Sequence, residues 1–94
     1  MALSRKAYLL ATCADDTRRD VASAAEIMKG VVRLRPASPY NEEVLGVIAA
    51  ARGKFDDATG HQKKALQARH YAEREGDKAR ARLSAYEERR PWRE

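Results

Sequence analysis

The chain has 94 residues and a formal net charge of +5, from 19 Lys and Arg against 14 Asp and Glu. This length supports one hydrophobic core and excludes nearly every two-domain enzyme architecture. Hydrophobic residues make up 44% of the chain but aromatic residues only 6%. Such material suits thin, alanine-packed helices better than a β-sandwich.

The single cysteine, Cys13, excludes an internal disulfide framework and a cysteine-based zinc site. The apolar stretch Ala7 to Ala11 follows Arg5 and Lys6, but it is too short for the core of a signal peptide. No window approaches the length of a transmembrane helix. The sequence therefore predicts a soluble, cytoplasmic protein with no membrane partner.

Gly, Pro and Asp residues, which favour turns and helix ends, divide the chain into segments that are predicted to be helical. The first is predicted over residues 3–12, with Leu3, Ala7 and Leu10 on one stripe. A polar stretch follows, and Asp20 is the predicted N-cap of a second helix that ends before Pro36. The predicted buried face of that helix comprises Val21, Ala24, Ala25, Met28, Val31 and Val32.

A third helix is predicted to start at Ser38-Pro39, with Ser38 as a side-chain cap and Pro39 in the first turn. Gly53 closes it, because glycine accepts the left-handed geometry of a helix end. The fourth helix starts near Phe55 and extends as far as Tyr71 and Ala72 if it stays continuous.

Glu75 and Gly76 are predicted to break the pattern before Asp77 opens a fifth helix. The tail over residues 89–94 contains Pro91 and should lie extended. The inward residues of the fifth helix would be Ala79, Leu83 and Tyr86.

Two segments repeat at a spacing of 34 residues. The shift pairs Ala24 with Ala58, Lys29 with Lys63, Val31 with Ala65 and Val32 with Leu66. The second unit also contains Leu45-Gly46 and the turn Gly53-Lys54-Phe55-Asp56-Asp57-Ala58. This pattern resembles a tetratricopeptide repeat (TPR). Residues 9–15 with 19–20, and 82–86 with 90–93, are similar to the closing repeats and terminating helix of bacterial TPR proteins.

The resemblance implies an all-α fold of antiparallel helical hairpins, a fragment of a right-handed α-solenoid. Residues 1–94 would form one domain, with repeat 1 at about 1–36, repeat 2 at about 37–70, and a capping helix and tail at about 71–94. As in the family, Pro91-Trp92-Arg93 would fold back, so that Trp92 covers apolar surface of the last hairpin. Gly46 and Ala58 would be the small residues that let the helices of one hairpin approach closely. Four residues depart from the family pattern, and they predict that the second repeat is less tightly packed than usual: Glu42, Ala49, Gln62 and His70.

The resemblance also implies a concave groove that binds another protein or peptide. It would be lined by Tyr8 and Thr12 of the first repeat and by Tyr40, Glu43, Val47, Ala50 and Ala51 of the second. Alternatively, Tyr8 and Tyr40 pack between helices. The predicted function is a non-enzymatic interaction module acting as a scaffold.

The sequence offers no catalytic constellation. Cys13, His61 and His70 could combine only if distant helices brought them together. The two histidines lie two and a half helical turns apart and cannot chelate one metal ion. The acidic cluster around Asp15 and Asp20 favours helix capping over a calcium site. We therefore predict no catalytic residue, no metal and no cofactor.

Two alternative functions remain. One is self-association as a homodimer through Leu3, Leu9 and Leu10, because two repeats bury little surface. The other is a basic nucleic-acid surface, which the interleaved acidic residues disfavour. The residues of that basic surface would be Arg82, Arg89, Arg90 and Arg93.

Overall fold

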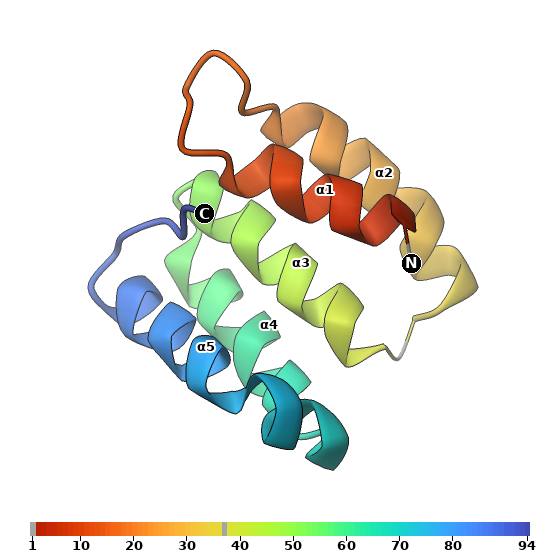
Figure 1. The fold of residues 1–94 in the computed structure, drawn as a ribbon, viewed down its shortest axis with the longest axis vertical. Coiled ribbons are helices and arrows are strands. Elements are labelled where there is room, and N and C mark those ends of the chain that lie inside the picture. Colours follow the sequence, from red (N-terminus) through yellow and green to blue (C-terminus); the bar gives the residue numbers. More distant parts are fainter. Residues whose placement is uncertain (1, 37) are drawn as a thin grey trace.

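The computed structural model describes residues 2–36 and 38–94, which form helices and no strand. This confirms the predicted all-α class. The five helices of the described residues are α1 (Ala2–Thr12), α2 (Val21–Leu34), α3 (Pro39–Ala51), α4 (Phe55–Leu66) and α5 (Arg69–Glu87) (Figure 1). The predicted boundary between the two repeats includes residue 37, which lies outside the described residues.

The helix α3 runs through the middle of the molecule and contacts each of the other four helices (Figure 1). On one side of it α1 packs against α2, and on the other α4 packs against α5. The helices α1 and α5 both contact α3 but not each other through their backbones. The functional question is therefore what lies between α1 and α5, over α3.

The ends of α2 agree with the sequence. The carboxylate of Asp20 accepts hydrogen bonds from the Ser23 amide at 3.0 Å and from the Ser23 hydroxyl at 2.7 Å, which makes it a side-chain N-cap. The helix ends at Leu34, and Arg35 leaves helical geometry before Pro36.

The turn between α3 and α4 depends on Gly53, as predicted. Its φ of 77° lies in the left-handed region. The Gly53 amide donates to Ala50 at 3.0 Å and the Lys54 amide to Ala49 at 2.9 Å, which is a Schellman motif. The start of α3 agrees only in part, because Pro39 occupies the first turn but the side chain of Ser38 forms no capping hydrogen bond.

The predicted break at Glu75 and Gly76 is wrong. The chain breaks instead at Gln67 and Ala68, and α5 is continuous through Gly76. One glycine inside a helix costs only about 1 kcal/mol. That cost is outweighed by the inward packing of α5, whose buried residues lie on both sides of the glycine: Tyr71, Ala79, Arg82, Ala85 and Tyr86.

The core is divided into small, alanine-rich clusters. The largest joins α1, α2 and α3, and its buried members are Ala7, Tyr8, Ala11, Ala24, Met28, Val44, Val47 and Ile48. In α1 the predicted stripe was wrong at Leu3, which is 59% exposed. The buried residues of α1 are Ser4, Ala7, Tyr8, Ala11 and Thr12, and Leu10 packs against the core while partly exposed, so the predicted stripe holds at Ala7 and Leu10.

The tail turns back from α5 toward the first hairpin (Figure 1). Arg89 takes the left-handed position after α5, with φ of 59°. The tail then runs without helix over residues 91–94, and Trp92 packs against the core on both sides of α3. The Glu94 amide donates to the Thr12 carbonyl at 2.8 Å. The predicted fold-back onto the last hairpin is confirmed at Trp92, and Glu94 reaches further, to α1 of the first hairpin.

Candidate partner-binding cleft

An open cleft of about 340 Å³ lies between α1, α3 and α5. Three of the predicted groove residues line it: Tyr8, Tyr40 and Glu43. The other lining residues are Ser4, Arg5, Val44, Arg74 and Glu75. The sequence therefore located the α1 and α3 walls of this cleft, whereas the α5 wall, with Arg74 and Glu75, was missed because a helix break was predicted there.

The remaining groove residues do not lie on an open surface. Val47 is 1% exposed and belongs to the main core cluster. Thr12 and Ala50 are buried and Ala51 is half-buried. The predicted groove is wrong at these positions for two reasons: α3 is the central helix and buries most of its faces, and the tail hydrogen-bonds to Thr12.

The walls of the cleft combine aromatic surface with charge. The ring of Tyr40 packs edge-on against Tyr71, with centroids 5.1 Å apart. The Tyr40 hydroxyl is buried without a hydrogen-bond partner among the described residues. The guanidinium of Arg5 lies 5.5 Å from the centre of the Tyr8 ring. Neither Arg5 nor Arg74 forms an ion pair with a described residue, so both charges on the rim are available to a ligand.

The floor of this region is a buried polar network centred on Arg82. Arg82 is 2% exposed, and its Nη1 donates to Glu43 Oε1 at 3.0 Å. Its Nη2 donates to the Tyr8 hydroxyl at 2.9 Å. The Tyr71 hydroxyl donates to the same Glu43 oxygen and accepts from Gln62 Nε2 at 3.1 Å. The network thus links α1, α3, α4 and α5.

Ionisation in this network follows from burial and pairing. Burial raises the pKa of the Tyr8 and Tyr71 hydroxyls, so both act as neutral donors. Burial, the largest single effect, opposes the charge on Arg82, but the Glu43 carboxylate together with Tyr8 and Tyr71 outweighs it, so the Arg82 pKa is raised. Arg82 is therefore a fixed positive charge inside the protein, and a buried charge of this kind requires its partners to stay in place.

The tail adds a carboxylate to the edge of the network. Glu94 Oε2 accepts from the Tyr8 hydroxyl at 2.7 Å and from Trp92 Nε1 at 2.6 Å. Glu94 Oε1 accepts from Lys78 Nζ at 3.0 Å. Burial alone would raise the pKa of the Glu94 carboxyl, but these hydrogen bonds lower it to about 2.

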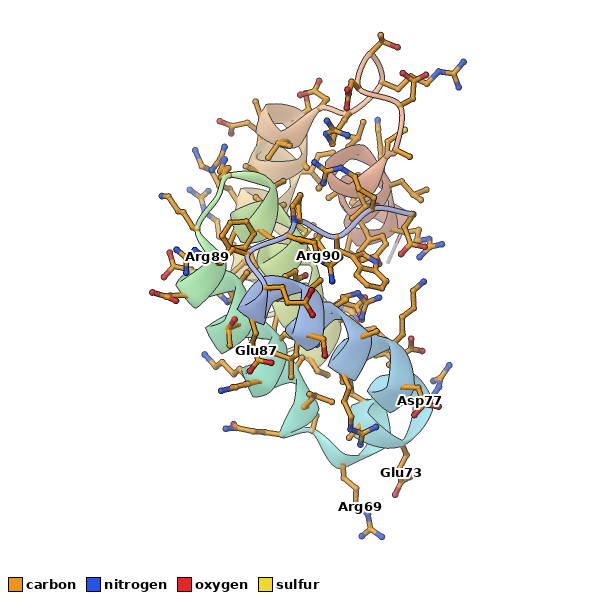
Figure 2. All side chains as sticks on the ribbon, turned by 90° about the vertical axis from the view of Figure 1, so that its left-hand side faces the viewer. Arg69, Glu73, Asp77, Glu87, Arg89 and Arg90 are labelled. Carbon is orange, nitrogen blue, oxygen red and sulfur yellow. The ribbon has the colours of Figure 1, made fainter. Side chains whose placement is uncertain are left out.

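The predicted basic surface is wrong at Arg82, which lies inside. Figure 2 views the molecule from the side of α5 and the tail, where Arg89 and Arg90 lie near Glu87. Arg90 pairs with Glu88 at 2.8 Å, and Arg89 lies over the ring of Phe55 at 5.5 Å. Arg93 is half-buried in the tail. On α5 itself, Arg69 pairs with Glu73 and Arg80 pairs with Asp77, so acidic side chains lie among the basic ones on its exposed surface.

The histidines and Cys13 lie apart. His61 contacts Glu42 Oε1 at 3.1 Å, His70 is exposed on α5, and Cys13 follows α1. Residues 2–36 and 38–94 contain no group of three or more His, Cys, Asp or Glu side chains arranged to hold a metal ion. Within these same residues, no helix is both long and apolar enough to cross a bilayer.

Sequence reasoning missed Arg82, Gln62 and Tyr71 as a connected set. A signal was present, because Ala79, Arg82 and Tyr86 follow helical three-and-four spacing. An arginine on an apolar stripe indicates a buried, paired charge.

No family model matches the chain, and no curated protein or solved structure shows significant similarity to it. The TPR resemblance therefore stays a prediction from the sequence.

Proposed function

We propose that this chain is a non-enzymatic interaction module that binds an extended segment of another protein in the cleft between α1, α3 and α5. The observation that carries the proposal is the cleft itself, which Tyr8 and Tyr40 line and at whose rim Arg5 and Arg74 form no ion pair with any described residue. Tyrosine and arginine are the residue types that contribute most to protein interfaces. With a net charge of +5, the protein attracts acidic segments through its long-range field.

We further propose that the scaffold is a TPR-like pair of hairpins with α5 as the closing helix. Two observations support this. The second helices of the hairpins begin at Val21 and Phe55, one 34-residue period apart. Gly46 also lies against α4 as expected, since a Cβ atom at this position would be 3.4 Å from the Ala58 carbonyl oxygen.

The proposal is tested by selecting peptides from a displayed random library on the wild-type chain. We expect selected peptides to lose at least tenfold in affinity for the double variant Arg5→Glu with Arg74→Glu, because both charges on the rim are reversed. The matched control is Arg33→Glu with Lys63→Glu, which makes the same charge change at exposed positions outside the cleft. Equal losses in the two double variants would show that net charge, and not the cleft, determines binding.

Self-association is a second candidate, because Leu3 and Leu9 on α1 are 59% and 47% exposed. The apolar hollow around Leu9 and Leu10 is bordered by basic side chains: Arg5, Lys6 and Arg18. Two copies meeting through this face would bring like charges together, which opposes a symmetric dimer at low salt. Light scattering coupled to size exclusion, at two protein concentrations and two salt concentrations, tests the candidate. A dimer that strengthens with salt and is lost in Leu9→Glu would establish it.

A further inference from the structure

The Glu94 side chain is bound as a ligand would be. Its two carboxylate oxygens accept hydrogen bonds from Tyr8 on α1, from Lys78 on α5 and from Trp92 in the tail itself. The backbone is fixed as well, since the Glu94 amide donates to the Thr12 carbonyl at 2.8 Å. Residues 92–94 thus make side-chain and main-chain contacts across two helices, α1 and α5, whose backbones are not in contact.

The site that receives this segment is preformed by buried charge. The guanidinium of Arg82 lies 5.4 Å from the centre of the Tyr8 ring and 5.6 Å from the centre of the Trp92 ring. Arg82 is fixed by Glu43, so its position does not depend on the tail. It provides a cationic floor under an aromatic side chain, and Tyr8 and Lys78 provide donors for a carboxylate two residues further along.

The tail is bound less deeply than the helices. Pro91, Trp92 and Arg93 are each half-buried, whereas the helical residues beneath them are fully buried. The C-terminal end of α5 is capped without the tail, because the Arg89 and Arg90 amides donate to carbonyls of α5 at 2.9 Å and 2.8 Å. Residues 91–94 can therefore be displaced while the end of α5 keeps these hydrogen bonds.

We propose that the site formed by Tyr8, Lys78 and Arg82 binds an aromatic-X-acidic segment of a partner protein, and that Trp92–Glu94 occupies it in cis. This inference rests on the proposed function, because Tyr8 belongs both to this site and to the open cleft, and Glu43 of the cleft holds Arg82 in place. One partner segment would fill the cleft and extend into the place of the tail.

A partner segment must compete with the tail for this site, and this competition determines its apparent affinity for the wild-type chain. A segment tethered by a few residues has an effective concentration of about millimolar or more. A short free peptide at micromolar concentration therefore cannot displace the tail of the wild-type chain. A partner succeeds by adding contacts in the open cleft, and weakening the tail should expose the site to a short probe.

The probe is a fluorescein-labelled peptide with the sequence of residues 90–94, Arg-Pro-Trp-Arg-Glu. It is titrated into the full chain and into the full chain with Trp92→Ala and Glu94→Gln. We expect the tail variant to bind at least tenfold more tightly than the wild type, and a probe ending in Gln to lose at least tenfold on the tail variant. Equal affinity for the two probes, or for the two proteins, would overturn the proposal.

The charge of the site is tested by Lys78→Gln in the tail-variant background. Lys78 is about half exposed, so its loss should leave the fold intact while weakening the probe severalfold and flattening the salt dependence. The matched control is Lys63→Gln on α4, which should leave binding unchanged. Similar effects of the two substitutions would contradict a specific carboxylate site.

A second measurement keeps the wild-type sequence. Trp92 is the only tryptophan, so a probe with Phe in place of Trp is silent in tryptophan fluorescence. Millimolar concentrations of this probe should displace the tail and shift the Trp92 emission to the red. No shift at saturating binding of the probe would show that it binds elsewhere, and the proposal would fail.

Two outcomes separate this inference from the proposed function. Library peptides that require Arg5 and Arg74, but lack an aromatic-X-acidic pattern and are indifferent to Lys78→Gln, would overturn the inference and leave the proposed function intact. Tail-probe binding as expected, with no cleft-dependent library peptide, would support the site and contradict the proposed function. A wild-type dimer abolished by Glu94→Gln would identify the tail of a second copy as the occupant and overturn the proposal.

Discussion

Arg82 on α5 and Glu43 on α3 form a buried ion pair, with 3.0 Å between Nη1 and Oε1. The arginine side chain is 2% exposed and the glutamate side chain 12% exposed. Such a pair gains little over apolar packing, but removing one partner leaves the other charge buried and unpaired. It therefore constrains the spacing between α5 and α3, which form two of the three walls of the cleft.

The first prediction concerns this pair. Arg82→Met should lower the free energy of unfolding by about 3–5 kcal/mol, because Glu43 is left buried without its cation. Urea denaturation followed by circular dichroism measures the change. The matched control is Arg80→Met, an exposed position on the same helix, for which we expect a change within about 0.5 kcal/mol. Equal stabilities of the two variants would mean that Arg82 is solvated in solution.

The second prediction corrects the sequence-based interpretation of Val47. On an open groove face, Val47→Arg would impair binding and spare the fold. In the core cluster it buries a charge with no partner, so it should destabilise the protein by more than about 4 kcal/mol. The control Ala22→Arg introduces the same side chain at an exposed position of α2. If the melting temperature of Val47→Arg matches that of this control, Val47 is exposed in solution and the core assignment is wrong.

The contrast between α2 and α3 shows what the sequence could predict. Asp20, Pro36 and Gly53 act through local backbone chemistry. The helix ends at which they lie, both ends of α2 and the end of α3, were therefore correctly predicted. The face that a helix buries depends on its neighbours. Because α3 is central, Val47 and Ala50 are buried along with Val44 and Ile48, and no periodicity within α3 distinguishes the two sets.

The tail shows a second limit. Sequence reasoning placed Trp92 against the last hairpin through a family resemblance, and the structure agrees. The carboxylate contacts of Glu94 could not be predicted, because they depend on Tyr8, which is 86 positions away. Only the packing of α1 and α5 against a common α3 brings Tyr8 and Lys78 within reach of one side chain.

The third prediction is a pH-dependent release of the tail. The folded-state pKa of Glu94 is about 2, below its ordinary value of about 4.5 in an unfolded chain. A lowered folded-state pKa contributes stability that is fully present above the unfolded value and is lost as the pH falls through the folded value. Docking of the tail should therefore weaken from about pH 4.5 toward pH 2, while Tyr8 stays neutral and Arg82 stays charged.

The emission maximum of Trp92 reports this release. At pH 7 it should lie to the blue of free tryptophan, because the ring is half-buried, and it should move to the red on acidification. In Glu94→Gln the emission should be red-shifted already at pH 7 and change little below pH 4.5. Helical circular dichroism, recorded in parallel, must persist through the transition. A red shift coincident with the loss of helix would mean global acid unfolding instead of tail release.

The fourth prediction concerns the close approach of α3 and α4. Ala58 is fully buried, and a Cβ atom on Gly46 would meet its carbonyl oxygen at 3.4 Å and His61 Cβ at 3.6 Å. These are ordinary contact distances for one methyl group and leave no room for a larger side chain. Gly46→Ala should therefore be neutral or stabilise by up to about 1 kcal/mol, because alanine is the better helix former. Ala58→Leu should cost about 1–3 kcal/mol through overpacking. Urea midpoints that move in the same direction for both variants would show that the two residues do not share this contact.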